Sequence, residues 1–395
     1  MRSNLWDLIK KADLVLLALC LIATLFGAAL IFSATRYDTG LHRAFLTQLA
    51  GAFLGIICYF ILTHLDLNLI MTKWKWLFGL SVVFILLLRT PLGVADDTGN
   101  RSWLAIPGVP FNVQPAEFVK LVFILLLAKQ LIWLQESRQG VSSLSSVAFL
   151  AGHVLFMGAL IFLVSGDLGM VTIYCLIFVG MTWAGRVSKW WFLTVGGGLI
   201  AAAVLLWNFV LPNTSLWTDY RIMRFRVLFD HDLDPLDIGW HQSRSLLAIG
   251  SGQLTGQGYL NGTQTQSAAS GSLPARHTDF IFAVCGEELG LVGCCAVLLL
   301  LTAIILRCFW VGLRSGDGFS LLVAVGVGTM LLAQTALNVG MCLYVAPVIG
   351  ITLPFFSYGG SSILTMYLAV GLVSGIHARE LPSWLKHGTA SASSS

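Results

Sequence analysis

Long apolar runs separated by short polar segments fill almost the whole chain. A run of about 17 to 25 apolar residues is long enough to cross a bilayer as a helix. The pattern predicts ten spans, at residues 14–33, 44–63, 73–89, 116–135, 147–164, 168–184, 190–211, 280–306, 319–345 and 360–377. We therefore expect an all-α integral membrane protein of about ten transmembrane helices, with a long loop at about residues 212–279 between the seventh and eighth.

The composition leads to the same fold class. Of the 395 residues, 57% are hydrophobic and 11% are charged, which excludes an ordinary soluble domain. Residues 1–385 are expected to form a single polytopic domain, and residues 386–395 a low-complexity tail. The eight cysteines lie in or at the ends of apolar runs, without metal-ligand spacing, so neither a disulfide framework nor a zinc site is expected. The net charge of +4 gives no indication of nucleic-acid binding.

The basic residues predict the orientation, because lysine and arginine are enriched in cytoplasmic loops. An N-terminus inside the cell places pairs such as Lys73 and Lys75 in the short inner loops and both termini in the cytoplasm. The basic residues assigned to the outer face are then all arginines: Arg36, Arg43, Arg89, Arg101, Arg221, Arg224, Arg226, Arg244 and Arg276. Arginine binds phosphate and carboxylate groups through two parallel hydrogen bonds, although anchoring to lipid headgroups would give the same pattern.

Unusual polar motifs emerge on this outer face. The segment Gly99–Trp103 precedes a helix carrying Glu117 and Lys120, which share one helix face at a spacing of three. Ionisable residues at membrane depth indicate either a functional cavity or a mutually neutralising structural pair. Asp167 lies in the short turn after the fifth span, where a helix N-cap would explain it equally well.

The long loop holds further candidates. Arg221 and Arg224 have helical spacing and predict one cationic face. Residues 239–258 are amphipathic, so this stretch lies in the membrane interface or dips into the bundle. The loop also contains four aspartates that lack the glycine and terminal glutamate of an EF-hand: Asp230, Asp232, Asp234 and Asp237.

The end of the loop and the chain beyond Asn338 complete the set. His277 and Asp279 stand just before the eighth span, where Asp279 is either a helix cap or a functional acid. Prolines and glycines break the helical pattern before and within the segment Ser357–Ser362. Broken backbone at membrane depth is tolerated only where protein or a cavity receives its polar groups. This segment is therefore expected to form the wall of an internal groove.

Four ordered blocks are similar to one family: FNVQPAEFVK at 111–120, AIGSGQLTGQGYLNGTQ at 248–264, LPARHTDFIFAVCGEELG at 273–290 and NVGMCLYVAPVIGITLPFFSYGGSS at 338–362. Along nearly its whole length the chain resembles the SEDS family of RodA, FtsW and SpoVE, and Arg276 before the His-Thr-Asp triplet favours the RodA branch. It departs from the family pattern in Ser165-Gly166 before Asp167 and in the uncharged stretch 267–272. No role of an acidic residue in that stretch is carried over.

The resemblance implies a peptidoglycan glycosyltransferase that polymerises lipid II into β-1,4 glycan strands at the outer face of the inner membrane during cell elongation. It implies that Asp279 is the catalytic carboxylate, and a carboxylate is able to serve as general base for an acceptor hydroxyl. The candidate substrate-binding residues are Arg101, Trp103, Glu117, Lys120, Asp167, Arg221, Arg224, Arg276, His277, Ser357, Ser361 and Ser362.

The implied partners are lipid II and a class B penicillin-binding protein. The sequence requires no cofactor, although a divalent cation, Mg²⁺ or Mn²⁺, would suit a pyrophosphate leaving group, and its ligands are not identified. Two alternatives stay open. A lipid II flippase would need polar access on both leaflets, and a non-catalytic scaffold for the penicillin-binding protein would need no catalytic acid.

Overall fold

The computed structural model describes residues 11–36, 42–95, 100–108, 111–137, 140–214, 217, 219–230, 233, 238–267 and 272–379. The predicted tail at 386–395, three of the loop aspartates (Asp232, Asp234 and Asp237) and the side chain of Arg221 lie outside the described residues.

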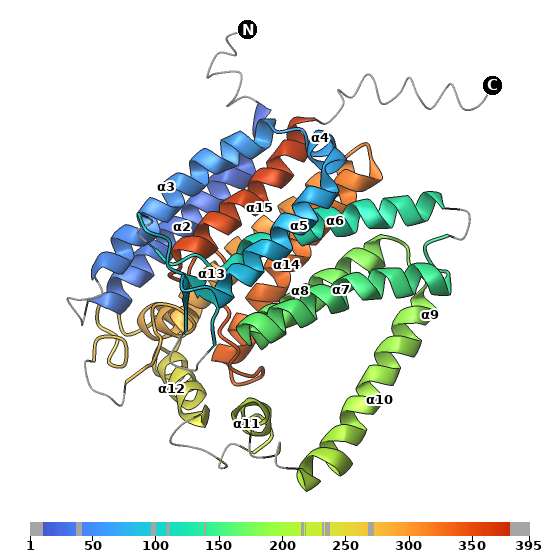
Figure 1. The fold of residues 1–395 in the computed structure, drawn as a ribbon. Coiled ribbons are helices and arrows are strands. Elements are labelled where there is room, and N and C mark those ends of the chain that lie inside the picture. Colours follow the sequence, from blue (N-terminus) through green and yellow to red (C-terminus); the bar gives the residue numbers. More distant parts are fainter. Residues whose placement is uncertain are drawn as a thin grey trace.

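Helices dominate the described residues, which confirms the all-α membrane fold (Figure 1). The main helices are α2 (Leu14–Thr35), α3 (His42–His64), α5 (Trp74–Leu86), α6 (Pro115–Glu136), α7 (Leu144–Ser165), α8 (Leu168–Ala184), α10 (Gly197–Leu205), α12 (Ile238–Ser251), α13 (Ile281–Arg314), α14 (Gly318–Cys342) and α15 (Gly360–Ala378). Shorter pieces are α4 (Leu67–Thr72), η2 (Leu87–Arg89), α9 (Lys189–Trp191), η3 (Phe192–Gly196), η4 (Leu206–Val210), η5 (Leu211–Asn213) and α11 (Tyr220–Arg226).

Helical segments occupy all ten predicted ranges, with some differences in their ends. Among the described residues, seven helices are long and apolar enough to cross a membrane, and α8 is a shorter apolar helix of 17 residues. The count of ten crossings therefore stays a prediction. The eighth predicted span was too short, because α13 continues to Arg314, and the ninth was too long, because α14 ends at Cys342.

The last helix, α15, is the most enclosed of the seven, with 83% of its apolar window buried. It packs along α3, where small residues allow close approach of the two backbones. A Cβ atom at Gly55 would lie 2.8 Å from the Tyr367 ring, and one at Gly371 would lie 3.0 Å from the Tyr59 backbone. Glycine at these positions therefore sets the distance between the two helices.

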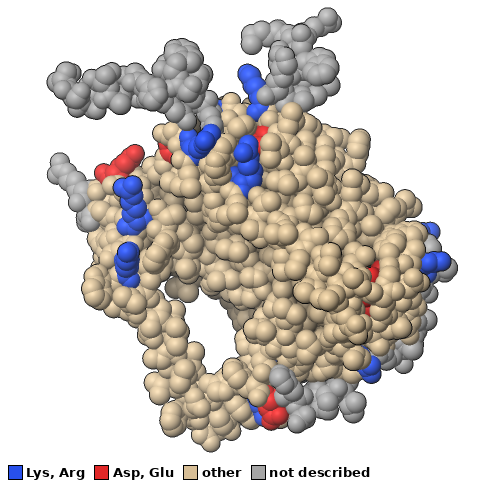
Figure 2. Space-filling model, turned by 180° about the vertical axis from the view of Figure 1, so that it is seen from behind, with Lys and Arg blue, Asp and Glu red and all other residues tan. Residues whose placement is uncertain are grey.

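One helical segment stands apart from the bundle. It runs from Lys189 to Asn213 through α9, η3, α10, η4 and η5, and none of its apolar window is buried (Figure 1). Its first turn is attached to the α6–α7 connection, since the Trp191 indole nitrogen donates to the Ser142 carbonyl at 2.9 Å. The space-filling view shows an opening between this segment and the rest of the molecule, and a broad surface with few charged residues (Figure 2). This surface is typical of a lipid-facing protein.

A buried ion pair joins the start of α2 to the C-terminal half of α13. The Arg307 guanidinium contacts both carboxylate oxygens of Asp13, at 2.8 and 3.0 Å, and Asp13 is only 1% exposed. The Asp13 backbone N–H donates to the Ser374 hydroxyl on α15 at 3.1 Å, and the Tyr59 hydroxyl on α3 donates to the Asp13 carbonyl at 2.8 Å. Four helices therefore meet at this pair, at the end of the bundle where α2 begins and α15 ends.

Replacing Arg307 with Met tests this connection. The substitution leaves the Asp13 carboxylate buried without its cation, so we expect the free energy of unfolding to fall by about 3–5 kcal/mol. Unfolding by sodium dodecyl sulfate titration in mixed micelles measures the loss. The control is Arg379→Met, which breaks an exposed contact with Asp66 at 3.9 Å and should change stability by less than about 1 kcal/mol. Equal losses in the two variants would contradict the assignment.

Candidate active site

A cavity of about 530 Å³ opens at the end of the bundle that carries α11 and α12. Its walls come from segments far apart in the sequence: the connection before α6, the α7–α8 turn, α11, α12, residues 275–280 and residues 348–362. All of these segments belong to parts of the chain that the sequence placed on the outer face. The structure therefore brings most of these motifs together around one space.

A small hairpin shapes one wall. Strand β1 (Gly93–Val94) pairs antiparallel with β2 (Trp103–Leu104), and Leu104 exchanges two backbone hydrogen bonds with Val113, at 2.7 and 2.9 Å. This pairing orders the connection between α5 and α6. Trp103 lines the cavity, as do Asn112 and Gln114 on the return segment.

Asp279 lies in the cavity wall immediately before α13, and it is partly exposed. The N-cap of α13 is Phe280 and makes no side-chain capping bond, so Asp279 does not act as the helix cap that the sequence left open. Among the described residues, no hydrogen bond reaches its carboxylate. Burial raises the pKa of Asp279 to about 7. Attraction from Arg224 opposes this rise, and repulsion from Asp167 adds to it.

The backbone of Asp279 is held firmly even though its carboxylate is not. The Asn338 side-chain amide, fully buried in α14, donates to the carbonyl oxygens of Asp279 at 2.8 Å and of Ile351 at 2.7 Å. The Ser357 hydroxyl donates to the Thr278 carbonyl at 2.6 Å, and the Tyr358 N–H donates to the His277 carbonyl at 2.8 Å. The broken segment before α15 therefore fixes the residues that present the carboxylate.

The other two acids of the cavity are already engaged. Asp167 caps α8, accepting from the Met170 N–H at 2.9 Å, and its second oxygen accepts from the Gln114 amide at 3.0 Å. Glu117 lines the cavity and pairs with Lys120 at 2.6 Å, with both side chains almost fully buried. Asp167 is therefore a helix cap and Glu117 is part of a buried ion pair, and both acids also face the cavity. A functional role for either of them stays a prediction.

The four candidate arginines are in different situations. Arg224 on α11 lines the cavity, whereas Arg101 is exposed and does not line it. Arg276 is 5% exposed and donates to the carbonyl oxygens of Leu273 at 3.0 Å and Ser267 at 2.9 Å, so its guanidinium ties the loop together. Arg221 lies in α11, and its side chain is outside the described residues.

Ser357, Ser361, Ser362 and His277 also differ in whether they reach the cavity. Ser362 lines the cavity and shares a hydrogen bond of 2.9 Å with Thr352. Ser357 supports the backbone, and Ser361 is fully buried. His277 packs near the Tyr358 ring, and burial, followed by the nearby Arg276, lowers its pKa. None of these last three lines the cavity.

The sequence reasoning assigned no role to His241, which also lines the cavity. Two buried neighbours anchor its helix to the end of α14: Gln242 donates to the Ala346 carbonyl at 2.8 Å, and Ser245 donates to the Cys342 carbonyl at 2.8 Å. The amphipathic stretch thus dips into the bundle. The available signal in the sequence was that His241, a polar residue, stands next to Gln242 on this amphipathic stretch.

The described residues do not fit a divalent cation. No group of three His, Cys, Asp or Glu side chains within the described ranges is arranged to hold a metal. Of the three cavity acids, Asp167 and Glu117 already bind protein groups.

The comparisons with known proteins identify the family of this chain. A family model for FtsW, RodA and SpoVE, described as cell cycle protein, matches residues 10–381. The chain belongs to this family. It is 31% identical over 377 residues to the peptidoglycan glycosyltransferase MrdB of Escherichia coli, covering 95% of this chain and 96% of that protein. It is 33% identical over 374 residues to stage V sporulation protein E of Bacillus subtilis, covering 92% and 96%.

Solved structures of the family share the fold. The rod shape determining protein RodA of Thermus thermophilus is 26% identical, with a TM-score of 0.67 and coverage of 94% of this chain and 98% of that chain. A chain from a structure described as the structural coordination of polymerization and crosslinking by a peptidoglycan synthase complex is 28% identical. Its TM-score is 0.77, and the alignment covers 94% of this chain and 99% of that chain.

In this FtsW/RodA/SpoVE family member, the block at 248–264 packs against a kink in α13. Gly290 has φ 65° and ψ −161°, so the helical ladder is interrupted there. The loop replaces the lost bonds: the N–H groups of Gln257 and Gly258 donate to the carbonyl oxygens of Glu287 and Glu288 at 2.9 and 3.0 Å. A Cβ atom at Gly256 would overlap the Glu288 carbonyl oxygen, so the loop approaches closely only because this residue is glycine.

The carboxylate of Glu287 holds the same loop from inside the bundle. It is fully buried and accepts from the N–H groups of Gln264 and Thr265 at 2.7 and 2.8 Å and from the hydroxyls of Thr263 and Thr265 at 3.1 and 2.6 Å. Four donors converge on its two oxygens, so this side chain holds the loop as an acceptor of hydrogen bonds.

Replacing Glu287 with Gln tests the role of this carboxylate in the loop. The new amide NH₂ faces donors, and each donor left without an acceptor costs about 1–3 kcal/mol. We expect the loop to open and to expose the buried Arg276. Trypsin should then cleave after Arg276 faster than in the wild type, with the fragments identified by mass spectrometry. Glu136→Gln, at the exposed end of α6, is the control. Unchanged cleavage in Glu287→Gln would mean that the loop does not depend on this carboxylate.

Proposed function

We propose that this protein is a peptidoglycan glycosyltransferase that polymerises lipid II into β-1,4 glycan strands. The observation that carries the proposal is Asp279, a carboxylate with a raised pKa, fixed backbone and no described hydrogen-bond donor, in the wall of a polar cavity. The named activity of the E. coli relative supports it.

The chemistry requires one base at this position. The 4-hydroxyl of an acceptor N-acetylglucosamine attacks the anomeric carbon of a donor N-acetylmuramic acid, and Asp279 takes the hydroxyl proton. The new bond joins the acceptor oxygen to that carbon. The bond from the carbon to the phosphate oxygen breaks, and its electron pair leaves with undecaprenyl pyrophosphate. Displacement from the opposite side converts the α-linked donor into a β-linked product, and no acid is needed for this leaving group.

Other cavity residues suit supporting roles. Arg224 is the described arginine positioned to bind the pyrophosphate, where its charge stabilises the negative charge that develops on departure. Trp103 offers an apolar ring face to a sugar, and Ser362 offers a hydroxyl. Arg276 and Ser357 act by holding the wall, and Lys120 neutralises Glu117, which lines the cavity.

The setting of the reaction is also a proposal. We place the cavity at the outer face of the inner membrane, because the basic residues favour an inner N-terminus. The expected partner is a class B penicillin-binding protein, which would crosslink the new strands during cell elongation. The similar chain from a complex that couples polymerization and crosslinking supports this assignment.

The first test is polymerisation of labelled lipid II by the protein co-purified with its transpeptidase, which a β-lactam blocks. We expect Asp279→Asn to lower the rate by about 10²- to 10⁴-fold, because the amide cannot accept the proton. Asp230→Asn, an exposed residue outside the cavity, is the control and should retain activity. Full activity in Asp279→Asn would show that Asp279 is not the general base. If the wild type makes no strands but moves lipid II between leaflets, the flippase takes the place of the enzyme.

The second test is the pH dependence of the same reaction. A base must be ionised, so kcat/KM should fall as the pH drops through about 7, the pKa of Asp279. Arg224 lowers this pKa and Asp167 raises it. Arg224→Gln should therefore move the acid limb to higher pH, and Asp167→Asn, which keeps a capping side chain, should move it to lower pH. Shifts in the same direction for both variants would contradict the assignment.

A further inference from the structure

A second cavity, of about 760 Å³, lies between α5, α6 and α7. Its lining includes Lys129 and Trp133 on α6, whereas Glu117 at the first cavity lies near the start of the same helix. The twelve residues from Glu117 to Lys129 correspond to about 18 Å along the helix axis. The second cavity is therefore separate from the candidate active site and lies toward the other end of the bundle.

The walls of this cavity are aromatic and preformed. Trp74, Phe78, Trp133, Phe149 and Phe156 line it. Phe78 contacts Phe156 with ring centroids 5.7 Å apart, and Trp133 contacts Phe149 at 6.0 Å. The volume is within the range of small-molecule sites.

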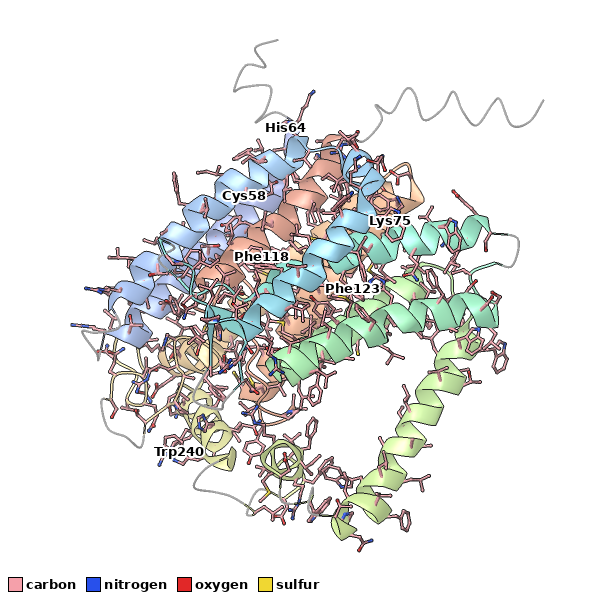
Figure 3. The ribbon with its side chains drawn as sticks, viewed as in Figure 1. Cys58, His64, Lys75, Phe118, Phe123 and Trp240 are labelled. Carbon is pink, nitrogen blue, oxygen red and sulfur yellow. The ribbon has the colours of Figure 1, made fainter. Side chains whose placement is uncertain are left out.

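A polar chain stiffens the deeper wall. The His153 imidazole Nδ1 lies 2.9 Å from the Gln130 side-chain oxygen, and the Gln130 amide donates to the Phe149 carbonyl at 3.2 Å. His153 also packs against Phe123, with ring centroids 5.0 Å apart; Phe123 and Lys75 are labelled in Figure 3. The Gln130 contacts connect α6 to α7 at the cavity.

The occupant must come from the bilayer. Trp74, Trp133, Phe149 and Phe156 are 41%, 60%, 55% and 47% exposed on the lipid-facing surface. A chain of lipid therefore reaches the cavity from the side without crossing protein. An apolar wall of this kind suits an acyl chain.

The charges select the headgroup. The Lys129 ammonium lines the cavity and donates to the Met71 carbonyl at 2.5 Å, which leaves two of its three N–H donors for a ligand. The Lys75 ammonium lies 5.8 Å from the ring centre of Trp74, which lines the cavity. No acidic residue of the described chain lines the cavity. Basic pockets between membrane helices bind anionic lipid headgroups.

We propose that the cavity between α5, α6 and α7 binds one anionic phospholipid, with an acyl chain among the aromatic residues and its phosphate at Lys129 and Lys75. The site does not depend on the proposed glycosyl transfer. Because it lies toward the opposite end of α6 from the candidate active site, its ligand is a resident lipid and not the reacting substrate.

Native mass spectrometry of the purified protein tests this site. The protein is mixed with equal amounts of phosphatidylglycerol and phosphatidylcholine that carry the same acyl chains. We expect preferential retention of phosphatidylglycerol, falling about fivefold for each lysine removed in Lys129→Gln and Lys75→Gln. Equal retention of the two lipids by the wild type would overturn the anionic headgroup.

A cavity-filling variant identifies the location. Gly152 lines the cavity, and a Cβ atom there would meet no heavy atom within 4 Å, so the side chain of Gly152→Leu starts in open space and is directed at the cavity volume. The control is Gly79→Leu on α5, where a Cβ atom is equally free but outside the cavity lining. Gly152→Leu should lose bound phosphatidylglycerol, whereas Gly79→Leu should keep it.

Thermal unfolding supplies an independent readout, because a ligand that binds only the folded state raises the melting temperature. Added phosphatidylglycerol should stabilise the wild type and Gly79→Leu but not Gly152→Leu. Retention by Gly152→Leu at the wild-type level would place the lipid elsewhere. If Gly152→Leu does not fold, the lysine variants and the wild-type lipid preference decide the question.

Discussion

The structure depends on one constraint: backbone N–H and C=O groups that leave a helix at membrane depth must find partners inside the protein. The chain breaks its helices at two places, at Gly290 within α13 and along residues 343–359 before α15. At the first break a loop supplies the missing hydrogen bonds. At the second, Asn338 and Gln48 do so, the latter by bonding both the Ser357 carbonyl and the Gly359 N–H.

This constraint also explains how a carboxylate is left available. Because Asn338 and Ser357 bind backbone atoms on either side of it, the position of Asp279 does not rely on its own side chain. Its carboxylate therefore needs no structural partner, in contrast to Asp167, which caps a helix, and Glu117, which pairs with Lys120. Asp167 and Glu117 thus bind protein groups, whereas the Asp279 carboxylate stays available to a substrate.

Hydropathy predicted the helical segments well, because their length is dictated by the bilayer. It also predicted that the polar motifs share one face. The directions of individual side chains were not accessible in this way: Arg276 and Ser357 belong to the right motifs, yet they bind loop and backbone atoms next to the cavity. His241 was missed for the same reason, since only the anchoring of Gln242 and Ser245 on α14 decides which face of α12 meets the cavity. Such contacts come from tertiary packing, which periodicity does not encode.

Under the proposed function, the charges of the cavity imply that binding of the glycosyl donor changes the basicity of Asp279. In the free protein, Arg224 attracts the Asp279 carboxylate and lowers its pKa. A bound pyrophosphate would take over that arginine and add negative charge nearby, and both changes raise the pKa of Asp279. The base would therefore become stronger once the donor is in place, which favours abstraction of the acceptor proton only in the complete complex. The acid limb of kcat, which reports the complex, would then lie above that of kcat/KM, which reports the free enzyme.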